Sequence, residues 1–108
     1  MAYGHINFVN LIGEVCRGPQ IIQDSKGKKS VRLFIETKEA TLNSQGNLKF
    51  KKNRHVLSAW GKWQQVIEEY IDVGCSIAIE GRLLTRCFQK NGTLHYYSEI
   101  EINDLTIL

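Results

Sequence analysis

The sequence lacks several features that would assign it to other protein classes. No stretch approaches the run of about 20 apolar residues that a membrane-spanning helix needs. The first ten residues have neither a basic start nor an apolar run, so no signal peptide is expected. There is no internal repeat and no low-complexity tract. The remaining composition, 43% hydrophobic and 23% charged over 108 residues, predicts one globular domain spanning residues 1–108.

Cysteines and catalytic motifs are also scarce. The three cysteines, Cys16, Cys75 and Cys87, are odd in number and form no CxxC pair, which argues against a disulfide framework. Free thiols indicate a reducing compartment, so we expect a cytoplasmic protein. The three histidines are scattered, and no HExxH, Walker or GxSxG pattern occurs. The sequence therefore predicts no enzyme, no metal site and no cofactor.

Positive charge is concentrated in one part of the chain. Eleven of the fourteen Lys and Arg residues lie between Arg17 and Lys62, although the net charge is only +3. Two lysine-rich clusters stand out within this region, at residues 26–32 and 49–54, and most acidic residues lie outside them. This split suggests one positive face, which suits a phosphate-bearing partner. The alternative is that the lysine-rich turns are simply solvated loops.

The hydrophobic pattern predicts strands with one helix between them. Strict alternation from Ser30 to Lys38 places Val31, Leu33 and Ile35 on one face and Phe34 on the polar face. Apolar residues spaced by three and four predict a helix over residues 63–72, with Trp63 and Tyr70 mainly in its core stripe. The other predicted strands are Ile6–Cys16, Lys51–Trp60, Cys75–Leu83, which Leu84–Lys90 continues into a hairpin, and Leu94–Ile102.

Glycines and polar segments mark the expected turns and bends. Gly18-Pro19 is expected to end the first strand, and a polar loop is expected over Ala40–Lys49. Asn91-Gly92 predicts a tight hairpin, because both turn residues need positive φ. Gly13 and Gly81 fit the bends that close a small sheet. Together these elements predict an all-β fold, a five-stranded OB-fold barrel with one short helix between strands 3 and 4, which binds oligonucleotides or oligosaccharides.

Short segments also resemble one known family in their order and spacing. They include Asn7–Gly13, Trp60-Gly61-Lys62, Glu80–Leu83, Thr85-Arg86 and Tyr96–Glu99. Through them the chain resembles the bacterial single-stranded DNA-binding protein family over nearly its whole length. The resemblance implies an OB-fold, usually a homotetramer, that binds single-stranded DNA non-specifically. It also implies a role in DNA replication, recombination and repair at the bacterial nucleoid.

The candidate DNA-binding residues combine aromatic rings, which stack on bases, with basic groups, which hold phosphates. For each aromatic residue, the alternative to a place in this groove is ordinary packing in the core. For Phe50, which lies near the end of a loop, both remain open. The resemblance places His55 at a subunit contact. We expect Asn7 and the first strand to join copies into a tetramer or a dimer, because an unpaired strand is an exposed edge. The candidate DNA-binding residues are Arg32, Phe34, Lys49, Arg54, Trp60, Lys62, Arg86 and Phe88.

The chain departs from the family pattern in three places. No aromatic residue lies in Ala40–Leu42, and Arg54 stands where the family commonly has a tryptophan. Arginine can itself stack on a base, but two missing rings predict weaker or more salt-sensitive binding. The family's acidic, flexible tail is also absent, so we expect no recruitment of partner enzymes. An alternative hypothesis is therefore a tailless primosomal or mobile-element OB-fold accessory protein that acts mainly through protein contacts.

Overall fold

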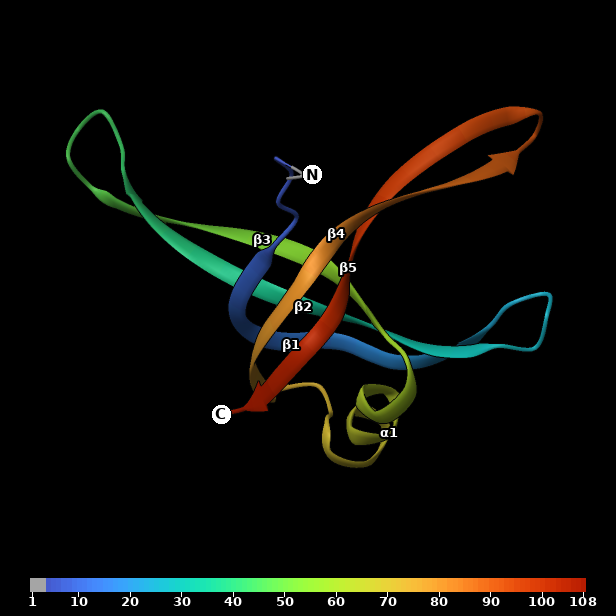
Figure 1. Cartoon of the computed structure of the whole chain (residues 1–108). Helices are drawn as coiled ribbons and strands as arrows, with labels where there is room; N and C mark the ends of the chain where they lie inside the picture. The colour runs from blue at the N-terminus through green and yellow to red at the C-terminus, as the bar shows by residue number, and fades with distance from the viewer. Residues whose placement is uncertain (1–3) are drawn as a thin grey trace.

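The computed structural model describes residues 4–108, and its five strands close into a barrel in the order β1-β2-β3-β5-β4. The helix α1 lies beneath the barrel and packs against β2 and β5 (Figure 1). This arrangement confirms the predicted all-β OB-fold barrel with its helix between the third and fourth strands. The expected domain boundary at residue 1 lies outside the described residues. The elements are β1 (Val9–Gln23), β2 (Lys29–Leu42), β3 (Leu48–Ala59), α1 (Gly61–Tyr70), β4 (Ser76–Lys90) and β5 (Thr93–Ile107).

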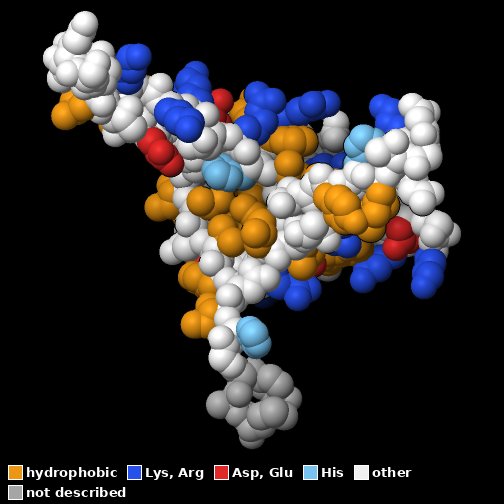
Figure 2. Space-filling model, turned by 90° about the horizontal axis from the view of Figure 1, so that it is seen from above, with side chains coloured by type: hydrophobic (Ala, Val, Ile, Leu, Met, Phe, Trp, Pro, Cys, Tyr) orange, Lys and Arg blue, Asp and Glu red, His pale blue; other side chains and the backbone are white. Residues whose placement is uncertain are grey.

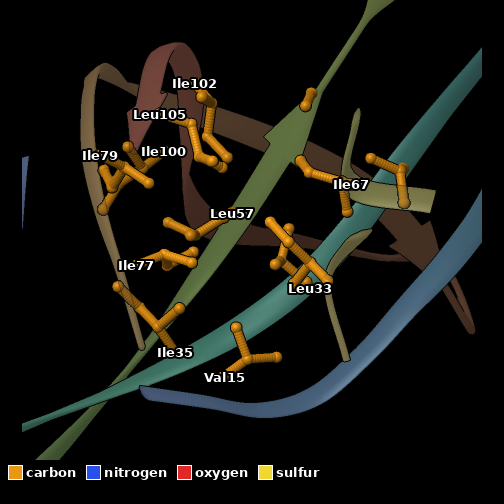
Figure 3. Packing of buried hydrophobic residues seen from close by; sticks show 13 residues of the cluster. Val15, Leu33, Ile35, Leu57, Ile67, Ile77, Ile79, Ile100, Ile102 and Leu105 are labelled. Carbon is orange, nitrogen blue, oxygen red and sulfur yellow. The ribbon is translucent and has the colours of Figure 1, made fainter. Parts of the chain in front are cut away.

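The barrel interior is filled by alternate residues of the strands and capped by α1. Val31, Leu33 and Ile35 are completely buried, as the alternation in the sequence predicts. Figure 3 shows how side chains from different strands point toward one another inside the barrel. Burial of each large aliphatic side chain stabilises the fold by about 1.5–3 kcal/mol. The complete cluster contains Val15, Val31, Leu33, Ile35, Leu57, Ala59, Ile67, Ile71, Ile77, Ile79, Ile100, Ile102 and Leu105.

The helix starts and ends two residues earlier than predicted, and one residue of its stripe is not in the core. Trp63 packs against the core, and its indole N–H donates to the carbonyl oxygen of Asn103 at 2.9 Å. Tyr70 is 60% exposed, so the prediction that it packs in the core was wrong. It is the last helical residue, and the next residue, Ile71, takes the buried position instead.

Two glycines allow neighbouring strands to approach closely. A Cβ atom at Gly81 would overlap the carbonyl oxygen of Glu101, and one at Gly13 would lie 2.7 Å from the carbonyl oxygen of Glu36. The pairing of β4 with β5 shifts register between Glu80 and Gly81, which marks a bulge. The ladder between β1 and β4 runs through Gly13 without such a shift. Gly13 therefore allows β1 to lie close to Glu36 of β2 and does not form a bulge.

The strands are longer than the sequence predicts, and three hairpins project from the barrel (Figure 1). Gly18-Pro19 does not end the first strand, because the pairing with β2 shifts register here and leaves the proline outside the regular ladder. The expected loop over Ala40–Lys49 shrinks to residues 43–47. The side chain of Asn43 closes that turn by accepting hydrogen bonds from the backbone N–H groups of Gln45 and Asn47.

The second long hairpin is the one predicted from Asn91-Gly92. Both residues have positive φ, 52° and 75°, as a two-residue hairpin turn requires. Because β4 and β5 pair continuously from this turn back to Gly81, they form a regular two-stranded arm. The β2–β3 arm and the β4–β5 arm are the two elements that shape the site described next.

Candidate nucleic-acid interface

The outer face of β2 and β3 carries polar and aromatic side chains in register. Arg32 pairs with Ser58, and Phe34 pairs with Val56. Residues directly opposite one another in an antiparallel ladder share a face. Because Val31, Leu33 and Ile35 point into the barrel, Arg32 and Phe34 point away from it.

The β4–β5 arm presents a second row of rings and charges. Arg86 pairs with Tyr97, and Phe88 pairs with His95. The rings of Phe88 and His95 stack, with centroids 5.2 Å apart and an angle of 17° between their planes. Tyr97 lies tilted beside Phe88 at 6.0 Å. One face of the Phe88 ring is therefore already supported by the protein.

A contact between β2 and β5 joins these two rows into one groove. Arg32 Nη2 donates a hydrogen bond to the hydroxyl oxygen of Tyr97 at 3.2 Å, and the guanidinium lies 5.7 Å from the tyrosine ring centroid. The groove consists of two adjoining hollows that share Arg32, Arg86 and Tyr97. Figure 2, which views the molecule from above, shows hydrophobic side chains exposed among Lys and Arg side chains.

We call the first part the aromatic hollow. Its volume is about 460 Å³, and apolar side chains form most of its wall. The rings of Phe34, Phe88 and Tyr97 come from three different strands, and two guanidiniums lie between them. This alternation of flat apolar surfaces and fixed positive charge suits a chain of bases joined by phosphates. The aromatic hollow is lined by Arg32, Phe34, Val56, Arg86, Cys87, Phe88 and Tyr97.

We call the second part the polar hollow, and its volume is about 230 Å³. Arg86 forms an ion pair with Glu99, whose side chain is only 3% exposed. The hydrogen bond to this carboxylate raises the pKa of Arg86 above its usual value, so the guanidinium stays charged. The polar hollow is lined by Ile22, Asp24, Lys28, Ser30, Arg32, Ser58, Trp60, Arg86, Tyr97 and Glu99.

Cations also lie over two further rings of the groove. Lys28 Nζ is 4.2 Å from the ring centroid of Trp60, and the Arg17 guanidinium is 5.4 Å from that of Phe34. Such cation–π contacts hold the long basic side chains beside the groove. They place positive charge next to the rings, where the phosphates of a stacked strand would pass.

Five of the eight predicted DNA-binding residues meet in this groove: Arg32, Phe34, Trp60, Arg86 and Phe88. The other three lie elsewhere. Lys49 pairs with Thr41, and the alternation along β3 puts it on the sheet face opposite that of Phe34.

The remaining two predicted basic residues do not line the groove either. Arg54 points from the same face as Val56 but lines a separate hollow, together with His55. Lys62 lies in the first turn of α1, with its Nζ 4.9 Å from the ring centroid of Trp63. A role of Lys49, Arg54 and Lys62 in binding stays a prediction.

Sequence reasoning did not select Tyr97, Lys28 or Glu99 for the site. One signal could have found two of them. In a two-residue hairpin, residues at equal distances before and after the turn face each other. Counting from Asn91-Gly92 places Arg86 opposite Tyr97 and next to Glu99. The position of Lys28 over Trp60 depends on how the β1–β2 turn folds back, and no local pattern encodes it.

The two residues predicted at a subunit contact lie beside the same residue of β4. The side-chain amide of Asn7 donates to the carbonyl oxygen of Leu83 and accepts from its N–H, both at 2.8 Å. His55 Nε2 lies 2.9 Å from Thr37 Oγ1, and His55 and Leu83 line one hollow of about 170 Å³. Nearby on the chain, Phe8 at the N-terminal side of β1 is exposed.

Two further properties concern residues 4–108 as a whole. No group of three or more His, Cys, Asp or Glu side chains in this part of the chain is arranged to hold a metal ion. No helix among the described residues is long and apolar enough to cross a membrane.

The barrel and its groove define the chain as an OB-fold domain with an aromatic and basic binding face. The model of the Single-strand binding protein family matches residues 6–108, and the chain belongs to this family. Its relatives include Single-stranded DNA-binding protein 1 of Chlorobaculum tepidum, which is 34% identical over 110 residues, covering all of this chain and 67% of that protein.

Solved structures agree with this assignment. A Plasmodium falciparum SSB in complex with ssDNA superposes with a TM-score of 0.86 at 25% identity, covering 100% of this chain and 99% of that one. A deletion mutant of the single-stranded DNA binding protein from Thermus aquaticus has a TM-score of 0.80 at 21% identity. That match covers 95% of this chain and 50% of the other, and it supports the fold alone.

Proposed function

We propose that this chain binds single-stranded DNA along the groove between its two arms, with little overall sequence preference. One observation carries the proposal. Aromatic rings and guanidiniums from β2, β4 and β5 alternate along a single open groove. Every base has a flat face that can stack on a ring, so such a groove accepts any sequence. The family membership and the names of the relatives support the same conclusion.

Each group of side chains has a defined part in this binding. Phe34, Phe88 and Trp60 offer ring faces to successive bases. Arg32 and Arg86 lie between the rings, and Arg17 and Lys28 lie beside them, where they neutralise phosphates. The ten-residue helix α1 packs beneath the barrel, so it is not placed as a recognition helix for the major groove of a duplex.

The biological role that fits this binding is protection of exposed single strands during DNA replication, recombination and repair in the bacterial cytoplasm. We propose a binding module of one domain rather than an enzyme, because nothing in the groove pairs a nucleophile with a base. A base-stacking groove requires no cofactor for this role.

We further propose that the chain acts as a homo-oligomer, a tetramer or a dimer, joined through β1 and the surface around Asn7 and His55. Phe8, which directly precedes β1, and Ile12 within β1 are exposed, and Leu83, which Asn7 contacts, is also partly exposed. Covering these apolar side chains with a second copy would remove them from water. Light scattering at micromolar concentration should give a mass above that of the monomer, and a monomer would contradict this part of the proposal.

The central test is a fluorescence anisotropy titration with labelled oligo-dT and with a duplex of the same length, at two salt concentrations. We expect tighter binding to oligo-dT and a loss of affinity at higher salt. Equal or tighter binding to the duplex would refute the proposed function. Specific capture of a protein partner without any binding of oligo-dT would instead favour an OB-fold accessory protein that acts mainly through protein contacts.

A further inference from the structure

The polar hollow contains two buried polar atoms that the protein itself does not satisfy. Ser58 is only 4% exposed, and its Oγ makes no hydrogen bond within residues 4–108. Arg32 Nε is likewise buried and unpartnered within this range. The two residues face each other across β2 and β3, and both line the polar hollow. A buried polar atom without a partner is costly, so these groups are poised for a ligand.

Strand β5, which pairs with β3, supplies a fixed acceptor to the polar hollow. Glu99 is almost fully buried, and Arg86 Nε donates to its Oε1. A carboxylate can accept several hydrogen bonds, so this pairing leaves acceptor capacity on Glu99. Asp24 also lines the hollow, but its Oδ1 already accepts from the backbone N–H groups of Lys26 and Lys28. Glu99 is therefore the acceptor available to a ligand.

These groups describe the ligand that the polar hollow fits. Its wall holds two carboxylates, Asp24 and Glu99, beside three cationic side chains, whereas the aromatic hollow has two arginines and no carboxylate, so a phosphate fits the aromatic hollow better. Donors and an acceptor in the same hollow favour a ligand edge that carries both kinds of group. Trp60 adds a flat ring to the wall. A volume of about 230 Å³ is smaller than the roughly 300–1,000 Å³ of pockets that hold drug-sized molecules. A single nucleobase meets all of these conditions.

Among the bases, guanine matches the wall best. Its Watson–Crick edge carries two adjacent donors, N1–H and the N2 amino group, beside the O6 acceptor. The donors suit Glu99, and O6, which has two lone pairs, can accept from both the hydroxyl of Ser58 and Arg32 Nε–H. Thymine has one donor flanked by two carbonyl oxygens, so one oxygen would face the carboxylate. Adenine and cytosine each offer only one donor group on this edge.

We infer that the polar hollow is a guanine-reading subsite within a groove that otherwise binds any sequence. This inference rests on the proposed function, because a base reaches the hollow only as part of a bound strand. Glu99 and Ser58 are the residues that determine the preference, and Trp60 forms the flat wall. Lys28, which lies over the Trp60 ring, must shift when the base stacks on that face.

The test compares an oligo-dT with the same oligomer carrying one central dG, dI or dA, by competition anisotropy. Inosine lacks the N2 amino group of guanine, and adenine tests purine stacking alone. We expect the dG oligomer to bind at least fivefold more tightly than oligo-dT, the lower end for a bidentate contact, with dI intermediate and dA close to oligo-dT. Equal binding of dG and dA, or of dG and dT, would overturn the subsite.

Variants assign the preference to the hollow. In Glu99→Gln and in Ser58→Ala, the affinity ratio of dG oligomer to oligo-dT should fall toward one. The ratio is taken within each variant, so a general loss of binding cancels. Glu101→Gln is the matched control, because Glu101 pairs with Arg82 at 3.3 Å on the same strands but does not line the hollow. An unchanged ratio in folded Ser58→Ala and Glu99→Gln refutes the inference. Failure of the wild type to bind any single strand refutes the proposed function instead.

Discussion

Replacing Phe88 by alanine tests the placement of the groove most directly. The side chain is 47% exposed, and His95 supports one face of its ring at a centroid distance of 5.2 Å. The exposed part of the ring offers a surface on which a base can stack. Loss of one base–aromatic stack costs about 1–3 kcal/mol. We therefore expect the Kd for oligo-dT to rise about fivefold to 150-fold.

The same substitution should leave the fold intact, because Phe88 lies on the β4–β5 arm and not in the barrel core. Its aromatic contacts with His95 and Tyr97 limit the loss in free energy of unfolding to about 1–2 kcal/mol. Anisotropy titrations with oligo-dT give the Kd, and thermal unfolding monitors the fold. Phe88→Leu should lose most of the affinity as well, since it keeps an apolar side chain but has no ring.

Phe50→Ala is the matched control for Phe88→Ala. Phe50 is 68% exposed on the β2–β3 arm, pairs with Ala40 and does not line either hollow. We expect its Kd to stay within about twofold of the wild type, as for other exposed positions away from a contact. Wild-type affinity in folded Phe88→Ala, or an equal loss in Phe50→Ala, would show that the groove is wrongly placed.

Three further outcomes are expected. The logarithm of the binding constant should fall linearly with the logarithm of salt concentration, by about 0.7 per phosphate neutralised, and a flat salt response would contradict the role of Arg32 and Arg86. Binding should quench tryptophan emission, and Trp60→Phe should abolish the quench, because the other tryptophan, Trp63, packs on the core with its N–H bonded to Asn103. A quench that persists in Trp60→Phe would show that Trp60 does not contact the bound strand. Gly81→Ala should lower the free energy of unfolding, measured in urea, by at least about 1–3 kcal/mol, because the added methyl group would overlap the backbone of Glu101. An unchanged midpoint of urea unfolding would show that β4 and β5 can separate here at little cost.

The faces of the strands and the number of elements followed from the sequence. Alternation in β2 identified Val31, Leu33 and Ile35 as core residues, and a change of period identified the helix. These features are local, because a strand repeats every two residues and a helix every 3.6 whatever surrounds them. Asn91-Gly92 likewise fixed its hairpin, since the positive φ values belong to the turn itself.

The ends of the strands were predicted less well, because where a strand ends depends on the neighbouring strand with which it pairs. Ala40–Leu42 and Lys49 look like loop residues when read alone. In the structure each is held in a ladder by the other strand of the arm. Gly18-Pro19 lies within β1 because a register shift accommodates it, and a register shift belongs to the pair of strands rather than to one of them.

The composition of the site was decided by tertiary structure. Arg32 and Tyr97 are 65 residues apart in sequence, and they meet only because the barrel closes through the parallel pairing of β3 with β5. The same closure buries Glu99 beside Arg86. The alternation of side chains along β3 places Lys49 on the face opposite that of Phe34. Residue types and local periodicity thus determined which side chains were suited to bind a single strand. Long-range strand pairing, which no short window of sequence encodes, determined which of them share a groove.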